Sequence, residues 1–142
     1  MNLNTDYVDK LRNSGLRPTK QRLKICEALF STEKTFHFTI NDLSKIIREK
    51  LREKISLATI YNTVHAFKKK GYLKEILINT DKSYFDTNTS VHHHFFDEDT
   101  NELIDCNEND IDSINVKNNI TGKKINSVEV LIKVERNNQN QN

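Results

Sequence analysis

The sequence contains little cysteine, and its two cysteines, Cys26 and Cys106, lie far apart. They form no CxxC pair, so this chain alone cannot supply a four-cysteine structural zinc site. The absence of paired cysteines fits a reducing compartment, and we expect a cytoplasmic protein. Cys26 recurs with apolar residues at helical spacing, which favours a small core residue over the alternative of a reactive thiol.

Long hydrophobic runs are also absent. No stretch approaches the roughly 20 apolar residues of a membrane-spanning helix, and the polar start MNLNTDYVDK does not resemble a signal peptide. Hydrophobic residues make up 35% and charged residues 30% of the 142 residues, which is a polar balance for a globular chain. We therefore expect no membrane partner, and we expect dimerisation to help bury enough apolar surface.

Charge is distributed unevenly along the chain. Residues 1–82 hold 17 lysines and arginines against 9 acidic residues, whereas residues 83–142 hold 5 against 11. A basic first part suits contact with the phosphates of a polyanion such as a nucleic acid. An acidic second part is not expected to lie on that polyanion. Solvated lysine-rich helices are common as well, so charge alone leaves this alternative open.

Helix signals dominate the first half of the chain. A first helix is expected to end near Gly15, and a second is expected to begin after the N-cap Thr19. A third follows the capping-box pattern of Thr39 and Asp42.

The most clearly marked helix lies between Ser56, which can cap its start, and Gly71, which can end it. Its buried face is predicted to comprise Leu57, Ile60, Val64 and Phe67. Its outer face is small, polar and aromatic, which suits base edges in the major groove of DNA. An ordinary amphipathic helix is the alternative.

After residue 72 the apolar period changes to two, which predicts strands. LKEILI and SYFD are expected to form one hairpin, and HHFFDED and ELIDC a second hairpin across Thr100 and Asn101. The segment INSVEVLIKVE is expected to form the last strand, with Val128, Val130 and Ile132 alternating, after a polar link holding at most a short helix. Three helices followed by a hairpin is the order of a winged helix-turn-helix.

Three adjacent histidines, His92, His93 and His94, stand between the basic and the acidic part. Alternate residues of a strand share a face, so His92 and His94 can bind one centre while His93 points to the other side. Imidazoles with a carboxylate suit Fe, Mn or Zn. A solvated polar run is the alternative.

Several segments together resemble the Fur superfamily of metal-responsive repressors: GLRPTKQRLKI, SLATIYNTVHAFKKKGYLKEI and the histidine block. Within it, YNTVHAF, KSYFDTN, HHHFF and VEVLIKV are most similar to the iron response regulator (Irr) branch. The resemblance covers about Leu11 to Arg136 and implies an α+β protein. Its expected parts are a winged helix-turn-helix DNA-binding domain (1–86), a small α/β dimerisation and ligand-sensing domain (87–136) and a disordered tail (137–142).

The resemblance also implies site residues. A sensory metal (Fe, Mn or Zn) would be bound by His37, Asp86, His92 and His94, whereas haem would use His92, His93 or His94. DNA contacts are expected from Arg17, Thr19, Arg22, Ala58, Thr59, Tyr61, Asn62 and His65. Asn62 replaces an arginine usual in Fur, which implies a different operator.

Other metal sites of the superfamily look incomplete in this sequence. A second site would include His93, but Val128 stands where its last histidine is expected. The CxxC pair of many Fur proteins falls on Asp97 and Thr100, and the Cys-Pro haem motif of some Irr proteins is missing, because the lone proline, Pro18, follows Arg17.

The Irr branch implies a homodimer that binds a double-stranded DNA operator and regulates iron and haem homeostasis, with haem weakening DNA binding. The alternative is a Fur-type repressor with Fe(II) or Mn(II) as co-repressor. A metalloenzyme is the competing class, but the chain lacks an HExxH motif and a nucleophile elbow. We therefore expect no enzymatic activity.

Overall fold

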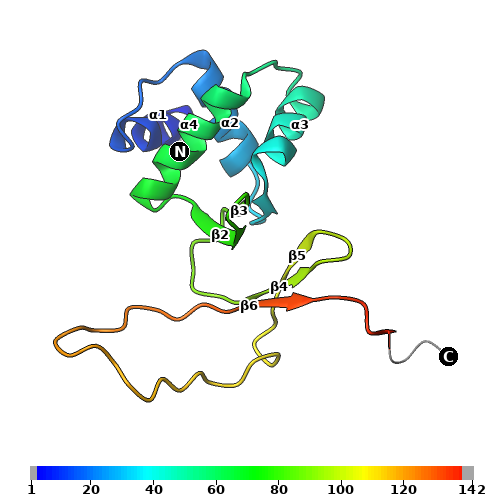
Figure 1. Ribbon diagram of the computed structural model, residues 1–142. Coiled ribbons are helices and arrows are strands. Elements are labelled where there is room, and N and C mark those ends of the chain that lie inside the picture. Colours follow the sequence, from blue (N-terminus) through cyan, green and yellow to red (C-terminus); the bar gives the residue numbers. More distant parts are fainter. Residues whose placement is uncertain (1–2, 139–142) are drawn as a thin grey trace. The chain divides into compact units, whose positions relative to one another are not determined.

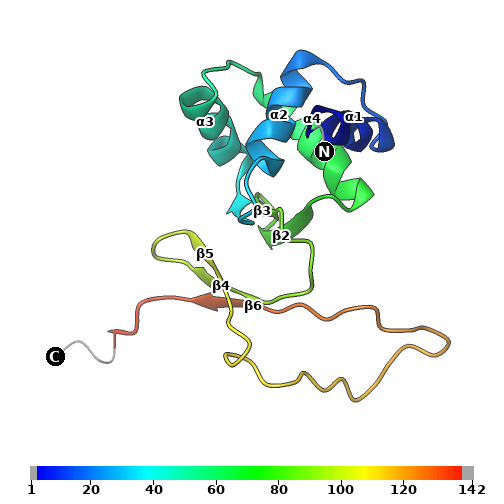
Figure 2. The same cartoon turned by 180° about the vertical axis from the view of Figure 1, so that it is seen from behind.

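The computed structural model describes residues 3–138. The chain divides into two compact units, residues 1–89 and residues 90–142. The first unit contains helices α1 to α4 and a sheet of strands β1, β2 and β3, and the second contains a sheet of strands β4, β5 and β6 (Figure 1, Figure 2). Within the described range, no helix is long and apolar enough to cross a membrane.

The helices of the first unit are α1 (Leu3–Asn13), α2 (Lys20–Phe30), α3 (Ile40–Lys50) and α4 (Leu57–Lys70). Their predicted caps are confirmed. Thr19 Oγ1 accepts a hydrogen bond from the backbone N–H of Arg22 at 3.3 Å. Thr39 and Asp42 form the reciprocal capping box, each side chain bonded to the other residue's backbone N–H.

Helix α4 begins and ends as predicted, at Ser56 and at Gly71, whose φ of 90° is the left-handed conformation that glycine adopts without strain. One expectation for its buried face is wrong: Leu57, the first helical residue, is 51% exposed. Thr63 is buried instead, and its hydroxyl donates to the Thr59 carbonyl at 2.8 Å. This bond satisfies the hydroxyl inside the core.

The sheet of the first unit comprises β1 (His37–Phe38), β2 (Lys74–Asn79) and β3 (Lys82–Asp86) in the order β1-β3-β2. The hairpin of β2 and β3 is the predicted wing. Strand β1 was not predicted, because two residues are too few to show an alternating pattern. It pairs antiparallel with β3 and sets His37 opposite Asp86.

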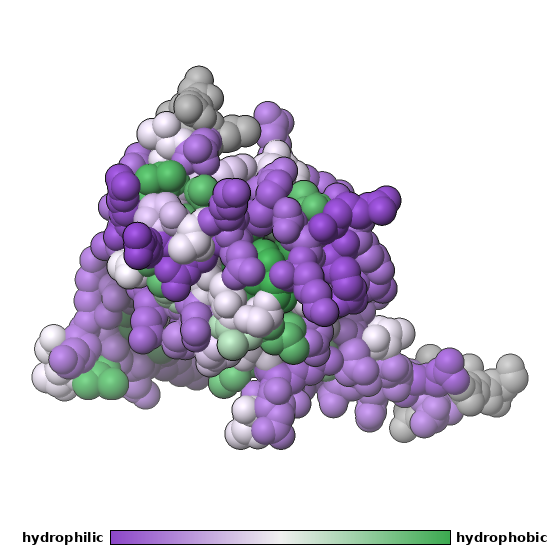
Figure 3. Space-filling view, turned by 90° about the horizontal axis from the view of Figure 1, so that it is seen from above, coloured by the Kyte–Doolittle hydropathy of each residue, from purple (hydrophilic) through white to green (hydrophobic). Residues whose placement is uncertain are grey.

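One hydrophobic core holds the first unit together. Helices α1 to α4 pack around it (Figure 1), with Phe38 and Phe67 among its largest fully buried side chains. The face shown in Figure 3 is mainly hydrophilic, with small hydrophobic patches. Helices followed by the β2–β3 hairpin are the arrangement of a winged helix-turn-helix, so the α+β architecture is confirmed.

The second unit is built on β4 (His94–Asp97), β5 (Glu102–Asp105) and β6 (Leu131–Val134), in the order β5-β4-β6. The predicted hairpin is present, but its turn spans residues 98–101 instead of Thr100 and Asn101 alone. The Asp97 carboxylate accepts backbone N–H groups of Asp99 and Thr100, and Asn101 adopts a φ of 58°. The last strand is shorter than the predicted 125–135, because β6 pairs in parallel only with the four residues of β4.

This unit buries few apolar side chains. Phe96 and Leu103 are its buried hydrophobic residues among those described. The exposed large hydrophobics of the unit are Val91, Ile104, Ile114, Val116, Ile120, Ile125 and Val134. The polar link contains no helix within the described range, and residues 139–142 of the predicted tail lie outside that range.

The two cysteines should differ in reactivity. Burial raises the pKa of the fully buried Cys26 to about 12, so its nucleophilic thiolate is scarce at pH 8. The pKa of the half-buried Cys106 is also raised, by burial and by Asp110 and Asp105. We expect a maleimide to label native protein at Cys106, and Cys26 only after unfolding, as measured by mass spectrometry. Rapid native labelling of a Cys106→Ser variant would contradict this assignment.

Candidate metal centre

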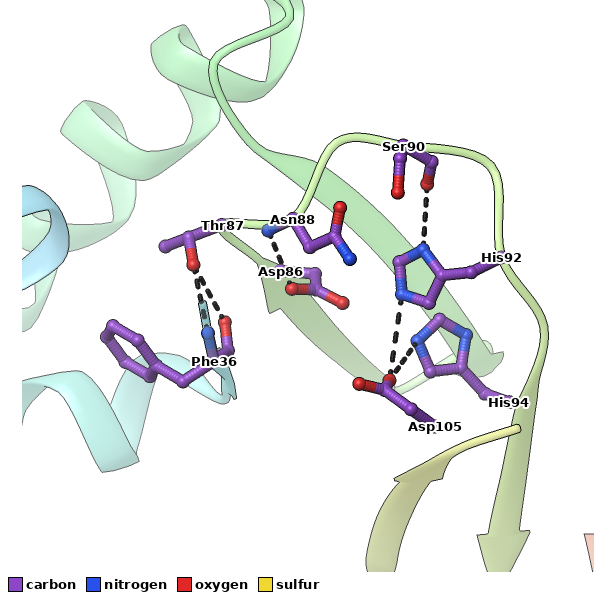
Figure 4. A network of polar contacts seen from close by, with 8 residues as sticks. All are labelled: Phe36, Asp86, Thr87, Asn88, Ser90, His92, His94 and Asp105. Atoms are coloured by element: carbon purple, nitrogen blue, oxygen red, sulfur yellow. Dashed lines mark hydrogen bonds and ion pairs between the residues drawn. The ribbon is translucent and has the colours of Figure 1, made fainter. Parts of the chain in front are cut away.

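The hairpin of β4 and β5 places His94 directly opposite Asp105. Directly opposed residues of an antiparallel pair project from the same face of the sheet. His94 is almost fully buried, and its Nε2 lies 3.1 Å from Asp105 Oδ1 (Figure 4). An imidazole and a carboxylate therefore meet at the start of β4.

His92 joins this pair from the segment just before β4. Its ring centroid lies 4.3 Å from that of His94, and its Nε2 lies 3.6 Å from Asp105 Oδ1. Its Nδ1 lies 2.7 Å from the Ser90 carbonyl oxygen (Figure 4). A carbonyl can only accept, so Nδ1 carries the proton and, in the neutral ring, Nε2 carries the lone pair.

The donor set fits a divalent transition metal. His92, His94 and Asp105 each offer a ligand atom, and these atoms lie within 4.8 Å of one another. Two imidazole nitrogens and one carboxylate oxygen suit Fe, Mn or Zn. A lone pair that faces a carboxylate oxygen is repelled unless a cation lies between them. The bond from His92 Nδ1 to a backbone carbonyl is the usual way to orient a metal-binding histidine.

His93 points to a different partner. Its Nδ1 accepts a hydrogen bond from the Val130 N–H at 2.9 Å, and its carbonyl accepts one from the Cys106 N–H at 2.9 Å. In the neutral ring the proton is therefore on Nε2, and the side chain ties β4 to the segment that leads into β6. His93 thus has a different partner from His92 and His94, although strand alternation is not the reason, because only His94 of the three lies in β4.

The first unit holds the other two predicted metal ligands as a neighbouring pair. His37 on β1 lies opposite Asp86 on β3, and the His37 ring packs edge-on against Tyr84 at 6.3 Å. Hydrogen bonds between Phe36 and Thr87 hold these strand ends together (Figure 4).

Asp86 is a buried carboxylate, only 1% exposed. Its Oδ1 accepts the Asn88 N–H at 2.8 Å (Figure 4), and Lys74 lies opposite it on β2. Burial lowers the pKa of Lys74, and the negative charge of Asp86 opposes that shift. A charged carboxylate inside a protein needs such compensation or a metal, which fits the predicted ligand role.

Two of the residues predicted to contact DNA are joined by a hydrogen bond at the start of α2. The Arg22 guanidinium donates to the Arg17 carbonyl at 3.0 Å, which fixes the backbone that presents the exposed Arg17 side chain. On α4, Ala58, Tyr61 and Asn62 are exposed, while Thr59 and His65 are half-buried.

Sequence reasoning missed Asp105. A two-residue turn at Thr100 and Asn101, as expected, would pair Asp99 with Glu102 and place Asp105 opposite Phe96. The loop instead spans residues 98–101 and pairs Asp97 with Glu102, which brings Asp105 opposite His94. The observed register of the hairpin thus identifies Asp105 as a candidate ligand. Residue type alone does not single it out, because the surrounding segment is rich in acidic residues.

Comparisons with known proteins agree with this geometry. Residues 13–134 match the family described as "Ferric uptake regulator family". The chain is 33% identical to the peroxide-responsive repressor PerR of Staphylococcus epidermidis over 109 residues, covering 77% of this chain and 71% of that protein. It is 30% identical to the peroxide operon regulator of Bacillus subtilis over 121 residues, covering 84% and 81%.

The fold is similar to those of solved ferric uptake regulators. The protein from Vibrio cholerae aligns with a TM-score of 0.68 at 22% identity, covering 91% of this chain and 98% of that one. The manganese-containing structure from Pseudomonas aeruginosa gives 0.64 at 21% identity, covering 92% and 97%. The relatives named above are peroxide regulators, so they do not support the expected likeness to the Irr branch.

The family match spans most of the chain, and the winged helix and the imidazole–carboxylate cluster agree with it. Members of the family are transcription regulators rather than enzymes. The chain belongs to the ferric uptake regulator family of metal-responsive, DNA-binding transcription regulators.

Proposed function

We propose that the chain is a repressor that binds its operator as a dimer when Fe(II) or Mn(II) is bound at His92, His94 and Asp105, with Asp86 and His37 as further ligands. The observation that carries this proposal is that His92 and His94 direct Nε2 toward one carboxylate oxygen of Asp105. Imidazole and carboxylate ligands are compatible with both metals.

The proposed coupling to DNA rests on which unit supplies each ligand. Asp86 and His37 belong to the DNA-binding unit, whereas His92, His94 and Asp105 belong to the second unit. Only five residues separate Asp86 from His92 along the chain. A ligand set drawn from both units would restrict their relative movement. Metal would then favour the arrangement in which paired winged helices fit DNA, and bound DNA would raise metal affinity by the same factor.

A haem response, which the likeness to Irr implied, has less support. The Val130 N–H occupies Nδ1 of His93, so neutral His93 carries its proton on Nε2. An axial haem ligand needs the lone pair at that position. His92 and His94 are already directed at a carboxylate, which suits a cation bound by side chains.

A peroxide response is the second candidate function. It is favoured by the two relatives described above, which are named as peroxide regulators and are 33% and 30% identical to this chain. Fe(II) can reduce hydrogen peroxide, whereas Mn(II) and Zn(II) at the same ligands are far less reactive. The response should therefore require Fe(II).

Metal binding should depend on the cluster in the second unit. His92→Ala, His94→Ala and Asp105→Asn should each lower Mn(II) affinity by at least about tenfold, the lower end of the loss on removing even an outer-shell partner. Isothermal titration calorimetry of metal-free protein measures the affinity. Bound metal should also raise the unfolding free energy, by about 2.7 kcal/mol at a hundred times the dissociation constant.

His93→Ala is the matched control, because it removes a neighbouring imidazole bonded to the backbone instead. It should retain Mn(II) affinity. Asp86→Asn and His37→Ala test the ligands of the first unit separately. Unchanged affinity in these two variants, with loss in the His92 and His94 variants, would limit the site to the second unit.

DNA binding should increase when metal binds. An operator selected from a randomised duplex library in the presence of Mn(II) should bind roughly 5- to 150-fold more tightly with Mn(II) than with a chelator, the usual range of coupling between two sites. Fluorescence anisotropy at fixed ionic strength measures both affinities. Asp105→Asn should abolish most of this difference.

The same assay separates the competing signals. Release of the operator by haem, with no effect of Mn(II), would contradict the metal proposal and favour haem. Loss of binding after hydrogen peroxide in the Fe(II) protein, but not in the Mn(II) protein, would establish the peroxide response. Equal affinity with metal and with chelator would contradict both metal-dependent functions.

The second unit is proposed as the dimer contact, because its exposed Ile114, Val116 and Ile120 have no core of their own to enter. Covering such side chains is favourable by about 25 cal/mol per Å² of apolar surface. Sedimentation equilibrium should give twice the chain mass of 16.6 kDa. An Ile120→Asp variant should shift the mass toward one chain. A wild-type protein that sediments as a monomer at micromolar concentration would contradict the dimer.

A further inference from the structure

Two aromatic side chains stack on the outer surface of α4. Tyr61 and His65 are four residues apart, so they lie on the same side of the helix one turn from each other. Their ring planes are almost parallel, with an angle of 9°, and their centroids are 5.5 Å apart. This is an offset stack, an arrangement that aromatic pairs favour.

The pair lies at the surface of the helix. Tyr61 is 50% exposed and His65 is half-buried, so neither is among the buried side chains of the first unit. Among the described residues, His65 also lies outside the group of side chains that could hold a metal ion. What His65 contacts on this surface is the ring of Tyr61.

A stacked neighbouring ring restricts the rotamers of an exposed tyrosine. An isolated tyrosine on a helix surface moves between rotamers, and ordering it on binding costs entropy. A parallel ring one turn away favours one orientation before DNA arrives. The exposed remainder of the Tyr61 ring is then presented at a defined angle near Ala58 and Asn62, two further exposed residues of the same helix.

We propose that His65 is a positioning residue that holds Tyr61 for contact with a thymine methyl group in the major groove. Apolar side chains recognise thymine by that methyl group, which no other DNA base carries in the groove. His65 therefore contributes to sequence discrimination through Tyr61 rather than by contacting a base itself. The proposal rests on operator binding by α4, as part of the proposed function.

The test measures the methyl group directly. The operator selected from a randomised library is remade with deoxyuridine at each thymidine in turn, which removes only the methyl. At the thymidine contacted by Tyr61, wild type should lose about fourfold in affinity, the fold-change for one methyl-sized group. His65→Ala should lower affinity for the intact operator by roughly two- to tenfold, the cost of ordering one side chain. It should also reduce the methyl effect toward unity.

His65→Phe is the matched variant, because it keeps a ring for stacking but has no ring nitrogen. It should restore both the affinity and the methyl effect. In a Tyr61→Ala background, His65→Ala should cause no further loss, since the two residues act through one contact. Thermal unfolding checks that each variant remains folded.

Two results would overturn the proposal. If His65→Phe is as weak as His65→Ala, and the slope of affinity against salt falls by about one, His65 contacts a phosphate directly. If His65→Ala keeps the full methyl effect, the stack does not position Tyr61. Failure of the proposed function is a separate outcome, because the wild-type protein would then select no preferred sequence.

Discussion

Antiparallel pairing brings a histidine opposite an aspartate in each unit of this protein. In the first unit β1 and β3 set His37 opposite Asp86, and in the second β4 and β5 set His94 opposite Asp105. In both cases backbone hydrogen bonds determine the register, so the side chains meet without further adjustment. The proposed metal binding depends on these two registers. A slip of one residue would turn each imidazole to the opposite face of its sheet.

The proposed DNA-binding surface on α4 is built more locally. Caps at Ser56 and Gly71 define where α4 starts and stops, and its buried side chains anchor it in the core. The outer face is thereby left with small and aromatic side chains at helical spacing, Tyr61 among them. The division is physical: apolar residues supply folding free energy, and the opposite face is available for recognition. The second unit buries too few apolar residues to supply comparable folding free energy. Its sheet is small, and its long link leaves apolar side chains exposed.

Much of the fold could be predicted from local signals. Capping residues, helical spacing and alternation identified four helices and both hairpins, because each of these depends on neighbours in the chain. Predictions failed where burial or strand length depends on residues that are distant in the chain. Leu57 falls on the apolar stripe by spacing, yet it stands at the first turn, beyond the reach of the core. The last strand is shorter than predicted because it pairs only along the four residues of β4. The alternation of Val128 and Val130 does not reveal this limit.

For the candidate site, the sequence by itself determined the supply of ligands: three adjacent histidines, a basic first part and no cysteine pair to compete for metal. Only the tertiary structure decided which of these side chains meet at one site. It joined His92 and His94 with Asp105, and it bonded His93 to the backbone of Val130, 37 residues away. The reason is that the sequence specifies which residue types can donate to a metal, but not where they lie in space. Which lone pairs converge depends on strand register and long-range hydrogen bonds, and these exist only once the chain has folded.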